Sequence, residues 1–274
     1  MKARTYQMVI SDFDGTLFRS DYSIADETKK TISKFIEKGG VFAISTGRTL
    51  QSILPIAREL NLKGVVSCFN GSVVADIQTG NVLFKKSLSP KETYIICEEL
   101  SKIGLSPLLY SLNDYYAATR NEYLERYERI VGVKAKIMDK PILEFVKERS
   151  FSTIKALCLV HPSKRDEYMQ FLQEKLGEAY YFTSGAKSLI EICPTGFSKG
   201  TAIKFLAEYY KVPIENVIAV GDSINDLPML KTAGLGLAVK NAEMALQNSV
   251  EVYPYTNDEN AVARIINQYA LKEI

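Results

Sequence analysis

Residues 7–17 read Gln-Met-Val-Ile-Ser-Asp-Phe-Asp-Gly-Thr-Leu, a short apolar run of β type followed at once by two acidic residues. Asp12 and Asp14 are two positions apart, so their side chains would point the same way if the strand continued, and Gly15 lets the chain turn. One carboxylate of such a pair can attack phosphorus while it coordinates a metal. The other can protonate a leaving oxygen and later deprotonate water. The alternative is an Asx-rich turn without chemistry.

The alternation of apolar runs and helical patterns continues beyond this stretch. Asp26 is the expected N-cap of a helix that Gly39-Gly40 ends. Residues 41–45 and 65–68 are the expected second and third strands, and Thr49 can cap the helix between them. Runs that are apolar throughout are typical of strands buried on both faces of a parallel sheet. This order predicts a doubly wound, Rossmann-like α/β sheet.

The pattern changes after Asn70-Gly71, where residues 72–76 and 81–84 are expected to form an antiparallel hairpin. An α+β pattern follows, with helices expected near 91–103, 121–131, 141–149 and 164–175 and strands near 107–111, 114–119, 153–160 and within 179–192. Parallel α/β order then resumes, with a helix from Ser198, a strand at 217–220, a helix from about Asn225, a strand at 234–238 and a last helix over 258–272. We therefore expect a discontinuous core domain, 1–84 and 188–274, interrupted by an inserted α+β domain, 85–187.

Composition excludes several classes of protein. The 274 residues are 46% hydrophobic and 24% charged, with a net charge of +2, which is too balanced for a dedicated binder of nucleic acid or membrane surfaces. No apolar run approaches the roughly 18–20 residues that span a bilayer. The apolar stretch near the N-terminus is too short for a signal peptide. We expect a soluble, cytoplasmic protein.

Histidine and cysteine usage narrows the chemistry further. His161 is the single histidine, which excludes histidine-nucleophile phosphatases, Ser-His-Asp triads and multi-histidine metal sites. The four cysteines contain no C-x-x-C pair, and we expect them to be buried, reduced residues: Cys68, Cys97, Cys158 and Cys193. Catalysis must therefore use carboxylates, hydroxyl groups, lysines or arginines.

Three further groups of polar residues lie at the ends of expected strands or the starts of helices, where open α/β sheets bind ligands. Ser45-Thr46-Gly47-Arg48 offers a hydroxyl group and free N–H groups to phosphate oxygens, although helix caps look alike. Lys199 could neutralise a carboxylate and a phosphoryl group, or be a surface charge. Asp222, Asn225 and Asp226 follow the strand at 217–220 and offer hard oxygen ligands, or helix caps. Beside Asp12 and Asp14 such ligands favour Mg²⁺ over zinc or copper.

Together the four groups resemble the haloacid dehalogenase superfamily of phosphatases and phosphotransferases. The Thr-Gly-Arg of the second group, Asn70-Gly71 and Gly-Asp-x-x-Asn-Asp-x-x-Met-Leu resemble its Cof-type branch, in which a type-IIB α/β cap is inserted between the second and third motifs. The resemblance covers essentially the whole chain, strongly at the motifs and only in outline in the cap. Two departures, Val239-Lys-Asn-Ala242 and Glu259-Asn260, lie outside the phosphoryl-transfer residues.

The resemblance implies a role for each site residue. Asp12 would form an aspartyl-phosphate, and Asp14 would act as acid and then base. Mg²⁺ would be held by Asp12, the backbone carbonyl of Asp14 and Asp222. The phosphate oxygens would be held by Thr46, Gly47 and Lys199. Asn225 would position Lys199 or phosphate. The site would be supported from outside by Ser45, Arg48 and Asp226.

The expected activity is hydrolysis of small phosphate monoesters, such as sugar phosphates or similar phosphorylated metabolites. A phosphomutase or phosphotransferase with the same aspartyl chemistry is the alternative, and a non-catalytic sensor of a phosphorylated ligand is a third. The physiological substrate does not follow from the sequence. Several residues of the insertion could either pack in its core or stack on a ligand: Tyr110, Tyr115, Tyr116, Arg120 and Tyr181. We expect a monomer or a small homo-oligomer.

Overall fold

The computed structural model describes residues 6–272. Residues 1–5, part of the stretch judged too short for a signal peptide, and residues 273–274, the end of the predicted core domain, lie outside the described residues. The chain divides into two compact units. The first unit comprises Met1–Gly47, Leu54–Leu83 and Ser198–Ile274, and the second unit comprises Arg48–Ile53 and Phe84–Phe197.

A five-stranded parallel sheet forms the centre of the first unit, with strand order β14-β13-β12-β1-β2. The strands are β1 (Met8–Ser11), β2 (Val41–Ile44), β12 (Val217–Gly221), β13 (Leu235–Ala238) and β14 (Glu251–Val252). Every residue of β1 and β12 is buried, as expected for apolar strands covered on both faces. The doubly wound α/β class predicted from the sequence is confirmed.

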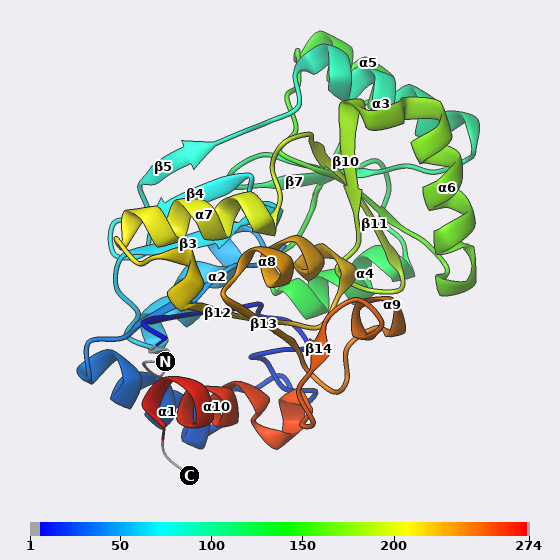
Figure 1. Ribbon diagram of the computed structural model, residues 1–274. Coiled ribbons are helices and arrows are strands. Elements are labelled where there is room, and N and C mark those ends of the chain that lie inside the picture. The colour runs from blue at the N-terminus through cyan, green and yellow to red at the C-terminus, as the bar shows by residue number, and fades with distance from the viewer. Residues whose placement is uncertain (1–5, 273–274) are drawn as a thin grey trace. The chain divides into compact units, whose positions relative to one another are not determined.

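Helices cover both faces of this sheet (Figure 1). On one face α1 lies beside α10, and on the other α7 lies beside α8. The helices with residues in this unit are α1 (Asp26–Glu37), α2 (Leu50–Glu59), α7 (Lys199–Tyr209), α8 (Leu227–Thr232), α9 (Met244–Gln247) and α10 (Ala261–Ile265), and the residues of α2 are divided between the two units. A π-helical turn, Ile266–Leu271, continues α10.

The third predicted strand, 65–68, does not extend the parallel sheet as expected. It is β3 (Val65–Cys68), which pairs antiparallel with β4 (Val73–Asp76) in a separate sheet of order β3-β4-β5, where β5 is Val82–Lys85. A tight turn at Phe69–Gly71 reverses the chain directly after β3, so the adjacent partner is antiparallel. One parallel bridge, Ser45 to Ser67, links β3 to the end of β2.

Several predicted helix ends shift for local reasons. The N-cap of α1 is Ala25, and Asp26 is the first helical residue. The helix expected from Asn225 begins as a 3₁₀ turn, Ile224–Asp226, before α8. The last helix begins at Ala261, because Asn260 adopts a left-handed conformation that separates it from a preceding 3₁₀ turn.

The second unit contains a six-stranded mixed sheet of order β10-β11-β9-β6-β7-β8. The strands are β6 (Leu108–Tyr110), β7 (Tyr115–Ala117), β8 (Lys136–Ile137), β9 (Ala156–Leu159), β10 (Tyr180–Thr183) and β11 (Leu189–Pro194). The helices are α3 (Pro90–Lys102), α4 (Glu122–Val131), α5 (Ile142–Glu148) and α6 (Arg165–Leu176). Apolar residues of the sheet pack with α3, α5 and α6 into one core, and α3 lies beside α5 and α6 (Figure 1).

The second unit extends past the end predicted for the insertion. The prediction ended the insertion at residue 187, but β11 pairs antiparallel with β9 and β10 and so completes the sheet of the second unit. The chain returns to the first unit at Ser198. The four cysteines are buried and form no disulfide bond with one another. No helix between residues 6 and 272 combines the length and apolar character needed to cross a membrane.

Gly71 allows the turn after β3 to pack against the start of α7. Its φ is +95°, and a Cβ at this position would lie 2.3 Å from the backbone carbonyl oxygen of Ser198. Gly39 has a similar φ, +86°, but a Cβ there would meet nothing within 4 Å. Substituting alanine at each of the two glycines therefore separates the energetic cost of a left-handed backbone, present at both, from the cost of a steric clash, present only at Gly71.

We expect Gly71→Ala to lower the free energy of unfolding by about 3 kcal/mol or more, because strain and overpacking combine. Gly39→Ala, the matched control, should cost only about 1–2 kcal/mol for the left-handed backbone. Urea denaturation of both variants measures the difference. Equal losses would show that the contact with Ser198 does not constrain the fold.

Candidate functional site

The register of the parallel sheet brings three polar strand ends together. Ser11, the last residue of β1, is in register with Ile44 of β2 and Val220 of β12. The N–H of Asp12 donates to the carbonyl of Val220 at 2.9 Å, so the acidic residue begins where the pairing ends. Asp12, Ser45 and Asp222 each follow within two residues of these positions, which places them along one edge of the sheet.

Lys199 lies at the centre of the site. It is the first residue of α7, directly after the capping residue Ser198, and its side chain is fully buried. Its Nζ donates to Asp12 Oδ1 at 2.6 Å and to Asp226 Oδ1 at 2.6 Å. A buried ammonium group is stable only when such partners satisfy it, so this lysine is not a surface charge.

Asp226 has the capping role that the sequence offered for it and also forms an ion pair with Lys199. Its Oδ1 accepts the hydrogen bond of Lys199, while its Oδ2 accepts from the N–H groups of Asp222 and Ser223 at 2.8 and 3.0 Å. Both oxygens are therefore used inside the protein. Gly221 makes room for this carboxylate, since a Cβ there would lie 2.4 Å from Asp226 Cγ.

Asp222 is held by hydroxyl groups. Thr16 Oγ1 donates to Asp222 Oδ1 at 2.7 Å, and Ser223 Oγ donates to Oδ2 at 3.2 Å. Gly15, with φ of +74°, leaves space for it, since a Cβ there would lie 2.5 Å from Asp222 Oδ2. The turn that contains Asp14 and Gly15 is thereby packed against the strand end that carries Asp222.

Burial and mutual repulsion shift the pKa values of this cluster. Burial and the nearby Asp226 raise the pKa of Asp12 well above its ordinary value, against the opposing effect of Lys199. Burial and Asp226 also raise the pKa of Asp222 to about 7. Burial alone would lower the pKa of Lys199, but Asp12 and Asp226 outweigh it and raise that pKa. One ammonium group thus does not neutralise the carboxylates around it.

The donor set fits a hard divalent cation. Carboxylate oxygens of Asp12, Asp222 and Asp226 lie within 4.8 Å of one another. Asp226 accepts from Lys199 and from two backbone N–H groups, whereas Asp222 accepts from two hydroxyl groups and Asp12 accepts from Lys199 through Oδ1. Asp12 and Asp222 therefore keep more acceptor capacity for a metal than Asp226 does. Mg²⁺ prefers oxygen-only ligands that carry excess negative charge. Burial first, and then the nearby Asp226, raise the pKa values of Asp12 and Asp222, and a bound cation would favour their ionised forms.

The expected phosphate loop lies beside a segment that sequence reasoning did not assign to the site. The N–H of Thr46 donates to the carbonyl of Ser67 at 2.9 Å, and the carbonyl of Thr46 accepts from the N–H of Asn70 at 3.0 Å. A Cβ on Gly47 would lie 3.0 Å from Asn70 Oδ1. Asn225 Nδ2 donates to the same oxygen at 3.1 Å, so Asn70 connects the loop to Asn225.

The remaining candidate residues occupy different surroundings. Asp14 is half-buried and forms a bridge to Phe18 within the turn after β1. Ser45 is buried and forms an isolated parallel β-bridge with Ser67, which is also buried. Arg48 belongs to the second unit, where its Nη1 donates to Ser52 Oγ at 3.3 Å.

Thr16 and Asn70 contact the candidate site, and the sequence analysis assigned neither of them a role in it. Both were visible as members of motifs, Thr16 in Asp-x-Asp-Gly-Thr and Asn70 in Asn-Gly. Their contacts join segments far apart in the sequence, from residue 16 to residue 222 and from residue 70 to residue 225. Local pattern alone does not indicate such pairings.

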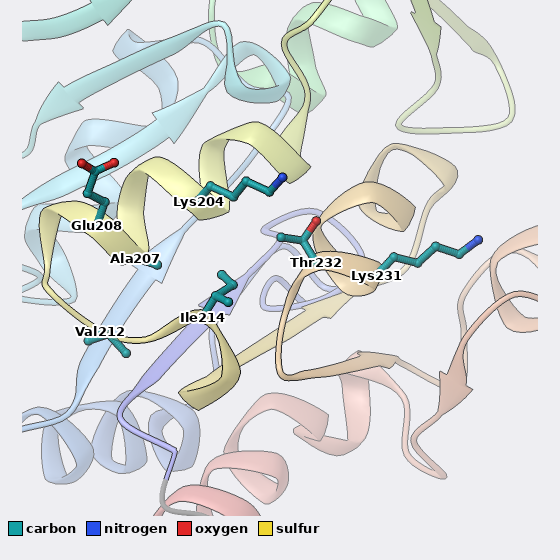
Figure 2. A pocket seen from close by; sticks show the side chains of 7 residues that line it. All are labelled: Lys204, Ala207, Glu208, Val212, Ile214, Lys231 and Thr232. Carbon is teal, nitrogen blue, oxygen red and sulfur yellow. The ribbon is translucent and has the colours of Figure 1, made fainter.

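A surface pocket of about 570 Å³ lies apart from these residues, in the first unit (Figure 2). Its lining comes from α7, α8 and the segment after α7, and consists of Lys204, Ala207, Glu208, Val212, Ile214, Lys231 and Thr232. None of the motif residues lines it. The acidic cluster, rather than this pocket, carries the chemistry expected of a catalytic site.

Comparison with known proteins agrees with the family resemblance found in the sequence motifs. The chain matches the family model of haloacid dehalogenase-like hydrolases over residues 9–266. A Haemophilus influenzae protein named "Putative phosphatase" is 30% identical over 267 residues, which cover 96% of this chain and 98% of the relative. A Bacillus subtilis protein named 5-amino-6-(5-phospho-D-ribitylamino)uracil phosphatase is 28% identical over 265 residues, with 97% and 96% covered.

A solved structure shows that the fold is shared as well. A sugar phosphatase of haloacid dehalogenase subclass IIB superposes with a TM-score of 0.82 at 17% identity, over 97% of this chain and 99% of that one. An identity this low carries the fold alone. With the family match and the phosphatase-named relatives, however, the assignment is complete: the chain belongs to the haloacid dehalogenase-like hydrolases, as a phosphatase of the Cof-type branch.

Proposed function

We propose that this protein is a Mg²⁺-dependent phosphatase that hydrolyses small phosphate monoesters through an aspartyl-phosphate on Asp12. The observation that carries the proposal is the buried cluster in which Lys199 bonds Asp12 and Asp226 beside Asp222. The cluster fixes one carboxylate at the end of β1 and surrounds it with groups suited to a transferring phosphoryl group.

In the first step, an oxygen of the Asp12 carboxylate attacks phosphorus and the bond from phosphorus to the ester oxygen breaks. Asp14 donates its proton to that oxygen, so the product leaves as a neutral alcohol. The hydrogen bond from Lys199 stabilises the ionised form of Asp12, which is the nucleophilic form. It also fixes the orientation of the carboxylate, because Asp226 holds Lys199 from the other side.

In the second step, Asp14, now ionised, takes a proton from water. The oxygen of that water attacks phosphorus, and the bond from phosphorus to Asp12 breaks. Inorganic phosphate leaves, and both carboxylates return to their starting protonation states. The same side chain serves as acid and then as base, so no histidine is needed.

Asp12 and Asp222, with the backbone carbonyl of Asp14, would hold the Mg²⁺. When bound, the ion supplies positive charge that offsets the repulsion between the phosphoryl group and the carboxylates. Thr16 orients Asp222 through its hydroxyl group. Thr46, the N–H of Gly47 and Lys199 would hold the phosphate oxygens, with Asn225 placed beside this loop through Asn70.

The substrate class is inferred from the relatives and the second unit. One relative is named for a phosphorylated ribityl compound, and a protein of the same fold is named as a sugar phosphatase. We propose that the second unit is the cap that selects among such polyol and sugar phosphates. A panel of phosphorylated metabolites, assayed for released phosphate, tests this. Release that required an added acceptor would indicate a phosphotransferase instead.

We expect Asp12→Asn to lower kcat at least about 10³-fold, because an amide cannot attack phosphorus. The measurement is phosphate release from para-nitrophenyl phosphate with Mg²⁺ present. Asp21→Asn, an exposed acid in the same part of the chain, is the matched control and should retain full activity. An Asp12→Asn enzyme with more than a tenth of wild-type activity would remove Asp12 as the nucleophile.

Activity should require Mg²⁺ and disappear in excess EDTA. Asp222→Ala should raise the Mg²⁺ concentration needed for half-maximal activity at least about tenfold, because it removes a charged ligand. Titration of activity against Mg²⁺ measures this, with Asp166→Ala, whose side chain is 87% exposed, as the control. Full activity in chelator would refute the metal requirement.

We expect Lys199→Met to reduce kcat/KM at least about 100-fold and to destabilise the protein by about 3–5 kcal/mol, since it leaves buried carboxylates without a cation. Adding Asp226→Asn should recover part of the stability by removing one of those charges, but none of the activity. Denaturation and kinetics on both variants separate the two effects. If the double variant regained activity, Lys199 would have no role beyond stabilising the fold.

A further inference from the structure

The turn between β3 and β4 is held in an unusual backbone conformation. Phe69, Asn70 and Gly71 have successive φ values of +50°, +56° and +95°. Glycine accepts this region freely and asparagine tolerates it, but an aromatic residue there is strained. Such strain persists where surrounding contacts impose it, and it is concentrated near functional sites.

The contacts that impose this conformation converge on the phosphate loop. Asn70 is 1% exposed, and its Oδ1 accepts from Asn225 Nδ2 at 3.1 Å. The same oxygen lies close to Gly47, since a Cβ added to Gly47 would be 3.0 Å from it. The N–H of Asn70 donates to the carbonyl of Thr46 at 3.0 Å. One residue therefore contacts both residues of the loop and the asparagine that follows β12.

The neighbouring residue ties the same turn to the helix that carries Lys199. The α-carbon of Gly71 lies so close to the carbonyl of Ser198 that no side chain fits between them. Asn225 Oδ1 is buried and has no hydrogen-bond partner among residues 6–272, although the other end of that amide is fixed by Asn70. Asn70 thus leaves an acceptor atom of Asn225 free for another donor.

From this geometry we infer that Asn70 is a positioning residue for phosphate recognition, an inference that rests on the proposed function of the Thr46–Gly47 loop. Its left-handed backbone and its amide oxygen together hold Thr46, Gly47 and Asn225 in a single arrangement. The ligand it serves is the dianionic phosphoryl group, either in the substrate or as released phosphate. If Asn70 were needed only to form the turn, removing its side chain while keeping the turn would leave phosphate binding unchanged.

Two variants separate positioning from turn formation. Asn70→Gly keeps the left-handed conformation and removes the side chain. Asn70→Asp keeps the shape of the side chain and its acceptor oxygen but places a negative charge against the loop. Both should fold, and the second keeps the test valid if the first does not.

We expect the dissociation constant for inorganic phosphate, measured by calorimetry with Mg²⁺ present, to rise about tenfold in Asn70→Gly and further in Asn70→Asp. KM for para-nitrophenyl phosphate should rise by a similar factor while kcat changes less than about threefold. In an Asn225→Ala background the effect of Asn70→Gly should shrink, because the two side chains act through one contact. Phosphate constants equal to those of the wild type in both variants would overturn the inference.

The binding measurement also separates this inference from the proposed function. If the wild-type protein bound phosphate but hydrolysed no ester, the proposed function would fail, while weaker binding by the variants would still support the role of Asn70. If the wild type hydrolysed esters and the variants bound phosphate normally, only the inference about Asn70 would fail. Phosphate that bound to neither wild type nor variants would overturn the inference as well.

Discussion

The ammonium group of Lys199 lies between the carboxylates of Asp12 and Asp226, and the candidate site of the first unit is arranged around that contact. The three residues come from the end of β1, the start of α7 and the turn before α8, separated by 187 and 27 positions along the chain. A buried ion pair gives little net stability compared with apolar packing. The proposed chemistry accounts for its presence at the centre of the fold, since Lys199 opposes the effect of burial on Asp12 and orients its carboxylate.

The surrounding fold satisfies the demands of this cluster. Parallel pairing of β1 with β2 and β12 aligns the strand ends, and Gly15 and Gly221 leave space for Asp222 and Asp226. The backbone N–H groups after β12 satisfy the outer oxygen of Asp226. Burial, together with the nearby Asp226, raises the pKa values of Asp12 and Asp222, and a divalent cation would favour the ionised forms of both carboxylates.

The sequence was most informative where structure is local. Uniformly apolar runs followed by polar residues predicted β1, β2 and β12 and the residues at their ends, because burial on both faces leaves a clear pattern. The pairing of β3 could not be predicted in this way, since an equally buried strand fits a parallel or an antiparallel neighbour. Two-residue strands such as β8 and β14 are too short to show periodicity. The end of the second unit also depended on a distant pairing, that of β11 with β9.

The same distinction applies to the site. Asp12, Asp222 and Lys199 could be proposed from motifs, but the ion pair between Asp226 and Lys199 at 2.6 Å could not. Asn70 was recognisable as half of an Asn-Gly turn, yet its contacts with Thr46 and Asn225 arise only from tertiary packing. Sequence patterns identified the groups for which we propose a chemical role more readily than those for which we propose a positioning role.

The stereochemical course at phosphorus tests the central claim, that Asp12 is the nucleophile, most directly. The substrate would be a monoester whose transferring phosphorothioate group is made chiral with oxygen isotopes and which is hydrolysed in isotopically labelled water. Two successive in-line displacements, the first by Asp12 and the second by water, predict overall retention of configuration. Inversion would show that water attacks the ester directly, and would contradict the assignment of Asp12.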